Sequence, residues 1–480
     1  MAHYERLSAQ DAFFLALEDT NCHQHVGAAL IFEAGPLRGA DGRMDIDRVR
    51  RAIESKLHFV PRFRQRLAFV PYENHPAWVD DDRFRVAYHV RHTALPRPGD
   101  ERDLKRLVGR IMSQPLDRGR PLWEIWFVEG FEDDRFALIS KTHHCMVDGV
   151  AGADLMSVIL EPWPNPEPEA PQPWQPRPRP SSAELGLNAV YRRLSQPAQA
   201  FQAISSAISE PTKTLERLGE AMSGLRDTIA PALRGTSPTP LNVEVGPHRR
   251  FDWLEMRIAD LKAVKNVLGG TLNDLVLTIV AGALRRFFEK KGYDTGQMKI
   301  SALVPVSVRP KEDRGELGNR VAQMNAQLPV DLANPIDRLR AVMRTMGGLK
   351  ESKQAVGAEV LTAISEWTVP NVLVQAVRLA EYSRTYNLMV TNVPGPQIPL
   401  YFLGCLMKTA YPVVTLFSNM ALSIGLFSFN GGLFWGLTAD WEQLPDVHDL
   451  VGFLEESFQE LQAEAAKGGS GQAGETGIGA

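Results

Sequence analysis

The sequence predicts a chain that mixes α-helices with β-sheets and contains more than one domain. Its 480 residues exceed one ordinary domain, and its apolar fraction of 44% and charged fraction of 23% are typical of folded proteins. An apolar strand pattern at Phe136–Thr142 is followed by an apolar helical pattern at Val150–Leu160. A second region with apolar strands and helices follows a proline-rich segment. Together these observations predict the α/β (α+β) class.

The prolines divide the chain. Residues 1–161 form a first region, and residues 162–248 hold a stiff proline-rich connector followed by apolar residues at helical spacing. Residues 249–466 form a second region, and the glycine-rich residues 467–480 are predicted to be a disordered tail. Cations accompany the apolar stripe of residues 181–230, which fits either packing on the two regions or contact with a lipid surface.

Charge and cysteine content exclude several classes of protein. The net charge of −4 provides no basic field for nucleic acid. The three cysteines, Cys22, Cys145 and Cys405, are scattered, which suits a reducing cytosol better than a disulfide framework.

The longest uncharged run, Thr409–Ala439, contains a hairpin signal at Ser428–Phe434, so we interpret it as core sheet and not as a membrane span.

The candidate site is the sequence HHCMVDG at residues 143–149, in a chain with only 11 histidines. Because side chains alternate along a strand, His143 and His144 are expected to point in opposite directions. An imidazole that titrates near neutrality suits removal of a proton from an alcohol, and we assign this role to His144. Asp148 is expected to orient an imidazole or pin the loop, and Gly149 permits an unusual backbone conformation or a close contact.

The motif has three other possible interpretations. A histidine pair buried in a core is the main structural alternative. A metal site is disfavoured because neighbouring strand residues diverge and no third ligand stands nearby. A nucleophilic pair of Cys145 and a histidine is disfavoured because the strand pattern places Cys145 opposite His144. Proton removal by His144 is the favoured interpretation.

The pattern His-His-x-x-x-Asp-Gly resembles the signature of an acyltransferase superfamily that includes peptide-synthetase condensation domains and chloramphenicol and carnitine acyltransferases. Further segments resemble, in order, motifs of its bacterial wax ester synthase/diacylglycerol acyltransferase branch. The first of them has Ala9 and Gln10 where the family more often has a proline. These segments are Leu7–Leu15, His25–Gly27, Pro121–Trp123, Pro247–Arg250, Thr271–Leu277 and Asn392–Pro396.

The resemblance implies two chloramphenicol-acetyltransferase-like lobes with an active-site tunnel between them. It implies transfer of a long-chain acyl group from fatty acyl-CoA, the co-substrate, to diacylglycerol or a long-chain alcohol, giving triacylglycerol or wax ester. We expect no other cofactor and no metal. The sequence has no Gly-x-Ser-x-Gly elbow, so we expect direct transfer without an acyl-enzyme. We expect a cytoplasmic protein, with peripheral contact to the membrane or lipid droplets as an open alternative.

The resemblance also nominates residues around the tunnel. Asn273 is expected to make a polar contact there and Asp274 to support it; the alternative is that one of them only caps a helix. Trp123 is expected to be a core residue beside the site, with substrate contact as the alternative.

Two further residues complete the predicted site. Arg309 either pairs with Asp148 or lies at the surface. Asn392 belongs to a rigid turn that is expected to shape the tunnel.

Two other functions remain open from the sequence. One is a condensation-type enzyme whose acyl donor is bound to a carrier protein. The other is a non-catalytic lipid-binding relative on an acyltransferase scaffold, against which the intact histidine motif argues.

Overall fold

The computed structural model of the chain describes most of both predicted regions. Three predicted site residues, Asp148, Gly149 and Arg309, lie outside the described residues, as does the segment 186–235 with most of the apolar stripe of residues 181–230. The described residues are 4–39, 41–70, 75–146, 155–165, 167–181, 183–185, 236–307, 321–351 and 386–472.

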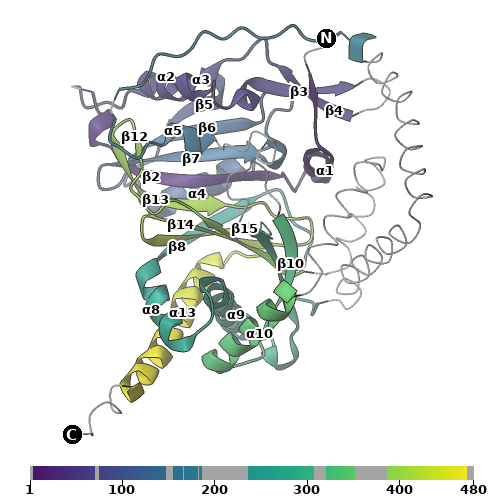
Figure 1. The fold of residues 1–480 in the computed structure, drawn as a ribbon, viewed down its shortest axis with the longest axis vertical. Coiled ribbons are helices and arrows are strands. Elements are labelled where there is room, and N and C mark those ends of the chain that lie inside the picture. Colours follow the sequence, from purple (N-terminus) through teal and green to yellow (C-terminus); the bar gives the residue numbers. More distant parts are fainter. Residues whose placement is uncertain are drawn as a thin grey trace, which may run out of the picture.

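The first lobe is built on a six-stranded mixed sheet in the order β12-β13-β2-β7-β6-β5, which forms the upper half of Figure 1. β7 (Arg135–His143) lies between β2 and β6, antiparallel to both. This confirms the strand predicted at residues 136–142. The other strands are β12 (Tyr401–Phe402), β13 (Cys405–Val413), β2 (His25–Glu33), β6 (Trp123–Phe131) and β5 (Val90–Ala94).

Helices and a small second sheet complete this lobe. Ser8 begins α1 (Ala9–Leu17), because its side chain accepts a hydrogen bond from the backbone N–H of Asp11, and Glu18 ends it. The remaining elements are α2 (Ile46–Lys56), α3 (Val86–His89), α4 (Glu101–Met112), α5 (Leu155–Ile159) and the three-stranded sheet of β1 (Glu5–Arg6), β4 (His75–Asp80) and β3 (Gln65–Val70).

The second lobe has its own six-stranded sheet in the order β10-β9-β11-β14-β15-β8, with helices below it in Figure 1. Its strands are β8 (Arg249–Arg257), β9 (Ile300–Ser307), β10 (Val321–Leu328), β11 (Leu388–Pro394), β14 (Leu422–Phe429) and β15 (Gly432–Asp440). Its helices are α8 (Ile258–Leu268), α9 (Leu272–Lys290), α10 (Pro335–Glu351) and α13 (Val447–Gln472).

Of two local predictions in this lobe, one is confirmed and the other is wrong in part. Asn430 and Gly431 form the turn between β14 and β15, both with positive φ, as the hairpin signal at Ser428–Phe434 predicted. The tail prediction is wrong for residues 467–472, because α13 continues to Gln472. The pair of Lys467 with Glu464, three residues earlier, adds support to this part of the helix.

One segment crosses from the second region into the first sheet. β12 and β13 lie within residues 249–466, yet β13 pairs with β2, and Figure 1 shows it on the side of the first sheet that is next to the second sheet. At the crossing, a Cβ on Gly436 of β15 would collide with the carbonyl oxygen of Pro412. Glycine is therefore required there, because it lets the two backbones approach closely.

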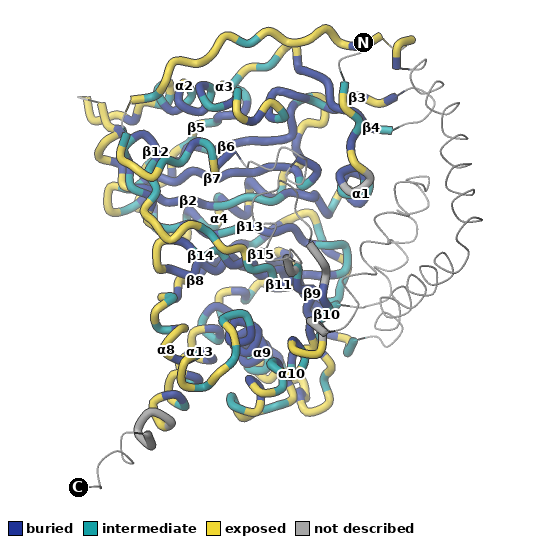
Figure 2. Tube along the Cα trace, viewed as in Figure 1, coloured by how far each residue is buried: buried dark blue, intermediate teal, exposed yellow. Residues whose placement is uncertain are grey.

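The buried residues follow the sheets and the helix faces turned toward them (Figure 2). Trp253 of β8 stacks on Tyr411 of β13 with ring centroids 4.6 Å apart, so the core continues across the two lobes. Within the described part of the chain, no single helix has the length and apolar composition to cross a membrane. α8 and α9 have that length and composition only when they are taken together, and they are bent by 96° relative to each other.

Candidate active site

His144 lies where the first-lobe sheet ends. β7 stops at His143, and a short 3₁₀ turn begins at His144. The sequence pattern had both histidines in the strand, so the predicted alternation of side chains ends one residue before His144. The backbone N–H of His144 donates to the carbonyl oxygen of Gln24, 2.7 Å away. Its ring stacks on Phe14 of α1 with centroids 3.8 Å apart and planes 23° apart. His144 is partly exposed, and this contact orients its ring.

His143 occupies a different environment. It is 1% exposed, and its Nδ1 accepts a hydrogen bond from the backbone N–H of Cys145 at 3.1 Å. Its Nε2 lies 3.6 Å from a carboxylate oxygen of Glu18. The two histidines therefore have different surroundings, one partly exposed and one held in the scaffold.

Glu18 is the centre of a buried polar cluster that the sequence analysis missed. Its side chain is 8% exposed and lies 3.7 Å from His23 and from His25. The Nε of Arg118 donates to it at 3.0 Å, and Nη2 contacts the same oxygen. Burial acts to raise the pKa of Glu18, but its contacts with His143, His23 and Arg118 outweigh burial and hold that pKa far below the usual range.

One member of this cluster, His25, could be found from the pairing of β2 with β7. His25 faces His143 across β2 and β7, with ring centroids 6.0 Å apart. Burial lowers the pKa of His25 well below its ordinary value, and the positive charge of Lys141 acts in the same direction, so His25 is neutral near pH 7. In the sequence, His25 is distinguished only as part of the segment His25–Gly27.

Cys145 and Trp123 are both buried. Burial raises the pKa of the Cys145 thiol well above its ordinary value, which opposes formation of a thiolate nucleophile. Trp123 is 1% exposed, donates from Nε1 to the carbonyl oxygen of Phe63 at 2.8 Å, and stacks on His89. Trp123 is thus a core residue paired with Thr142 of β7, as the favoured interpretation had it.

The structure corrects the capping interpretation at the start of α9. The N-cap is Thr271, and neither Asn273 nor Asp274 occupies that position. The carboxylate of Asp274 accepts from the backbone N–H of Thr271 at 2.8 Å, and the hydroxyl of Thr271 accepts from the backbone N–H of Asp274 at 3.2 Å, so the two residues form a capping box. Asn273 is half-buried in the first turn and takes no part in this box. Asp274 thus has a supporting role, and the tunnel contact of Asn273 stays a prediction.

The remaining predicted residues are not brought together by the described structure. Asn392 is half-buried on β11, where it pairs with Leu426 of β14. Asp148, Gly149 and Arg309 lie outside the described residues, so the two alternatives for Arg309, an ion pair with Asp148 or a position at the surface, both stay predictions.

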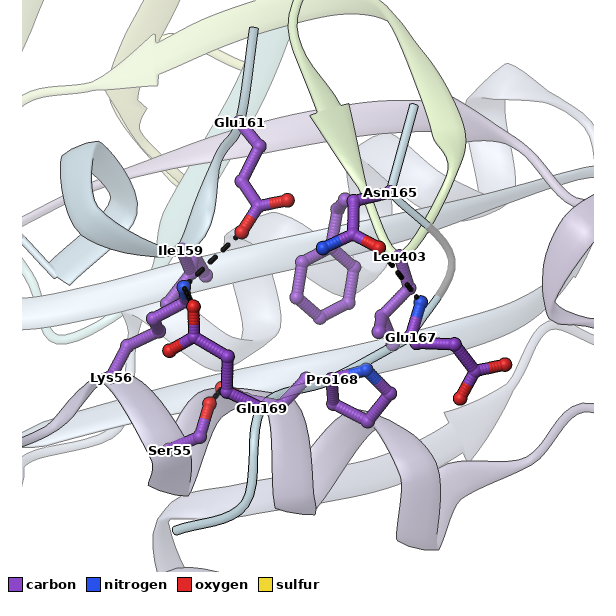
Figure 3. Close-up of a pocket in the computed structure, with 11 residues that line it drawn as sticks. Ser55, Lys56, Ile159, Glu161, Asn165, Glu167, Pro168, Glu169 and Leu403 are labelled. Atoms are coloured by element: carbon purple, nitrogen blue, oxygen red, sulfur yellow. Dashed lines mark hydrogen bonds and ion pairs between the residues drawn. The ribbon is translucent and has the colours of Figure 1, made fainter. Parts of the chain in front are cut away.

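One small hollow lies beside α2 and β12, away from the histidine cluster. Figure 3 shows Lys56 reaching toward Glu161 and Glu169, which lie 3.2 and 3.3 Å from its Nζ. The volume is about 20 Å³, enough for roughly one water molecule. Its size and acidic lining make it unsuitable for an acyl chain.

Comparison with solved structures identifies the class of fold. A condensation domain, the first of the CDA synthetase, matches with a TM-score of 0.55 at 16% identity, covering 96% of each chain. The wax ester synthase/diacylglycerol acyltransferase from Marinobacter aquaeolei VT8 matches with a TM-score of 0.70 at 25% identity, covering 96% of this chain and all of that one. The fold is therefore the two-lobed acyltransferase fold that was predicted.

The sequence comparisons then identify the family. Residues 7–276 match the wax ester synthase/diacylglycerol acyltransferase catalytic domain, and residues 317–462 match the C-terminal domain of the same family. Two putative diacylglycerol O-acyltransferases of Mycobacterium tuberculosis strain CDC 1551 are 33% and 34% identical, over 96% and 95% of this chain and 90% and 99% of their own lengths. The chain belongs to the wax ester synthase/diacylglycerol acyltransferase family and is an acyltransferase.

Proposed function

We propose that this chain transfers a long-chain acyl group from fatty acyl-CoA to the hydroxyl group of diacylglycerol, a long-chain alcohol, or both. The products are triacylglycerol and wax ester. Family membership and the mycobacterial relatives named diacylglycerol O-acyltransferases support this choice of substrates. The observation that carries the mechanism is the partly exposed ring of His144, held on Phe14 next to the buried His143.

In this mechanism, His144 accepts the proton of the acceptor hydroxyl as its oxygen attacks the thioester carbonyl. A tetrahedral oxyanion forms, which Asn273 or a backbone N–H stabilises by donating a hydrogen bond. The C–S bond then breaks, and the proton on His144 passes to the departing thiolate of CoA. Binding both substrates together supplies the proximity, so no acyl-enzyme is required.

The direct test is to incubate the purified protein with palmitoyl-CoA and either dipalmitoylglycerol or hexadecanol. Formation of ester with release of one free CoA per ester supports the proposal, and the ratio of the two rates gives the acceptor preference. Ester formation only from a carrier-bound acyl donor would identify a condensation-type enzyme. No ester with any alcohol and either donor would indicate a non-catalytic lipid-binding protein.

We also propose peripheral contact with a membrane or lipid droplet, because both acceptors are carried in lipid. The protein should float with anionic liposomes in a density gradient, and less so at high salt if cations contribute. Recovery of all the protein in the soluble fraction would contradict the contact.

A further inference from the structure

Glu18 is a buried carboxylate to which the proposed mechanism gives no role. Four cationic or titratable side chains from three parts of the chain surround it: His23 and His25 from the segment after α1 and the start of β2, His143 from β7, and Arg118 from the segment after α4. A buried carboxylate needs such partners, because isolation of the charge from water is costly. The cluster is therefore built around this one negative charge.

Contacts on both sides of the His143 ring fix its tautomer. Since the backbone N–H of Cys145 donates to Nδ1, that nitrogen carries no proton, and the ring proton of neutral His143 resides on Nε2. Nε2 lies 3.6 Å from Glu18, which favours a proton at this position. The pair of contacts holds the ring between Glu18 and the first residues of the 3₁₀ turn.

His144 begins that turn and shares two further connections with Glu18. Its ring stacks on Phe14, which belongs to the helix that Glu18 ends. Its backbone N–H donates to Gln24, in the segment between Glu18 and β2. A shift of Glu18 would therefore move three supports of His144 together: the helix, the segment 19–24 and the end of β7.

The second lobe holds the same segment from the other side. Arg249, at the start of β8, donates from Nη2 to the carbonyl oxygen of Asn21. The hydroxyl of Thr415 donates to the carbonyl oxygen of His23 at 3.0 Å. Glu18 thus lies at the start of a segment that both lobes contact and that accepts the backbone hydrogen bond of the proposed base, His144.

We propose that Glu18 is a positioning residue for acyl transfer: it fixes the tautomer of His143, orients His144 through the shared segment, and provides a buried negative charge next to the histidines. This inference rests on the proposed function. Among the described residues, Lys141 on β7, Asp11 on α1 and Cys145 in the 3₁₀ turn are further charged or titratable groups near the cluster. Glu18 lies 3.7 Å from His25 and 3.6 Å from His143, the two histidines that face each other across β2 and β7.

The test is the substitution Glu18→Gln, which keeps the size of the side chain and removes its charge. We expect kcat for ester formation to fall about 10- to 100-fold, with the KM for palmitoyl-CoA within about threefold of wild type. Without the negative charge, protonation of a nearby imidazole is less favourable. The acidic limb of the kcat–pH profile should therefore shift to lower pH. A purely structural role would lower kcat without this shift.

Two further variants keep the test decisive. Glu33→Gln makes the same change at an exposed carboxylate on β2, paired with Lys408, and should behave as wild type. Glu18→Asp keeps the charge but shortens the side chain, and should restore the position of the acidic limb while kcat stays reduced. If Glu18→Gln does not fold, as judged by circular dichroism, the kcat of Glu18→Asp decides.

The outcomes separate the two proposals. Wild-type kcat and pH profile in folded Glu18→Gln, or wild-type kcat in Glu18→Asp when the first variant is unfolded, would overturn the role of Glu18. If the wild-type protein forms no ester in the same assay, the proposed function is what fails.

Discussion

At the scale of single residues, the site depends on the unequal surroundings of His143 and His144. The former is buried and hydrogen-bonded by Cys145, whereas the latter is partly exposed and stacked on Phe14. This arrangement suits a division of work in which one ring supports and the other exchanges a proton. The neighbouring thiol of Cys145, with its raised pKa, contributes packing and no nucleophile.

The stack on Phe14 leads to a prediction for activity. Replacing Phe14 with Leu keeps an apolar side chain but removes the ring that orients His144. We expect kcat to fall about 2- to 10-fold, corresponding to the ~0.5–1.5 kcal/mol of an aromatic pair. Steady-state release of CoA measures this, and Phe13→Leu on the same helix is the control. Equal rates for the two variants would argue against an orienting role of the stack.

Glu18 leads to a prediction for the pH dependence of stability. Its folded pKa lies far below the ordinary value of 4.5, so its charge stabilises the fold above that pH, and this stabilisation is lost as pH falls below it. Glu18→Gln should be less stable than wild type by about 3 kcal/mol at pH 7, with the difference shrinking below pH 4.5. Urea titrations from pH 7 to pH 3.5 measure it. A difference that stays constant over this range would contradict the ionised, partnered state of Glu18.

At the scale of elements, β6 and β7 present the site, and the core behind them fixes their position. Trp123 fills the space between Phe63 and His89 and pairs with Thr142, one residue before His143. The capping box of Thr271 and Asp274 likewise fixes the start of α9, where Asn273 lies. In both cases a structural residue positions a predicted site residue: Trp123 supports the strand that ends at His143, and the capping box positions Asn273.

Truncation of Trp123 tests this support. Trp123→Ala should cost about 3–5 kcal/mol of stability, because it leaves a large cavity and removes the hydrogen bond to Phe63. Trp126→Ala, in the same strand but partly exposed, is the control and should cost clearly less. Thermal denaturation compares the two. A cost below 1 kcal/mol for Trp123 would show that the strand does not depend on it.

The sequence predicts well those elements whose signals are local. The apolar run at residues 136–142 predicted β7, and the Asn-Gly pair at 430–431 predicted the β14–β15 turn. Glu18 was missed because a glutamate at a helix end is usually solvated, and its burial depends on Arg118 and His143, far away in sequence. The roles of Asp148 and Arg309 stay predictions from the family resemblance.

At the scale of the whole molecule, the two lobes share strands as well as a core. β13 leaves the second region to pair with β2, and Lys105 of α4 forms an ion pair with Asp252 of β8 at 2.7 Å. The proline-rich connector predicted a division of the chain at residue 249. That prediction could not include the pairing of β13 with β2, because strands so far apart in the sequence leave no local pattern when they pair. The lobes are thus expected to unfold together.

Replacement of Gly436, where β15 lies against β13, tests whether the two lobes unfold together. Gly436→Ala would place a methyl group against the backbone of Pro412, so we expect a loss of at least ~2 kcal/mol and lower activity. Gly452→Ala in α13 meets nothing within 4 Å and should be neutral or stabilising by up to ~1 kcal/mol. A single melting transition that moves down for Gly436→Ala only would agree with this account. Two transitions, with only one of them shifted, would show that the lobes unfold independently.

The central claim is that His144 moves the proton during acyl transfer, and replacing it is the most direct test. CoA release from palmitoyl-CoA is measured for His144→Ala with hexadecanol and with dipalmitoylglycerol in parallel, with His92→Ala at a surface ion pair as control. We predict a fall of ~10²–10⁴-fold with both acceptors, while circular dichroism stays that of wild type. A folded His144→Ala variant that releases CoA at the wild-type rate would contradict the mechanism.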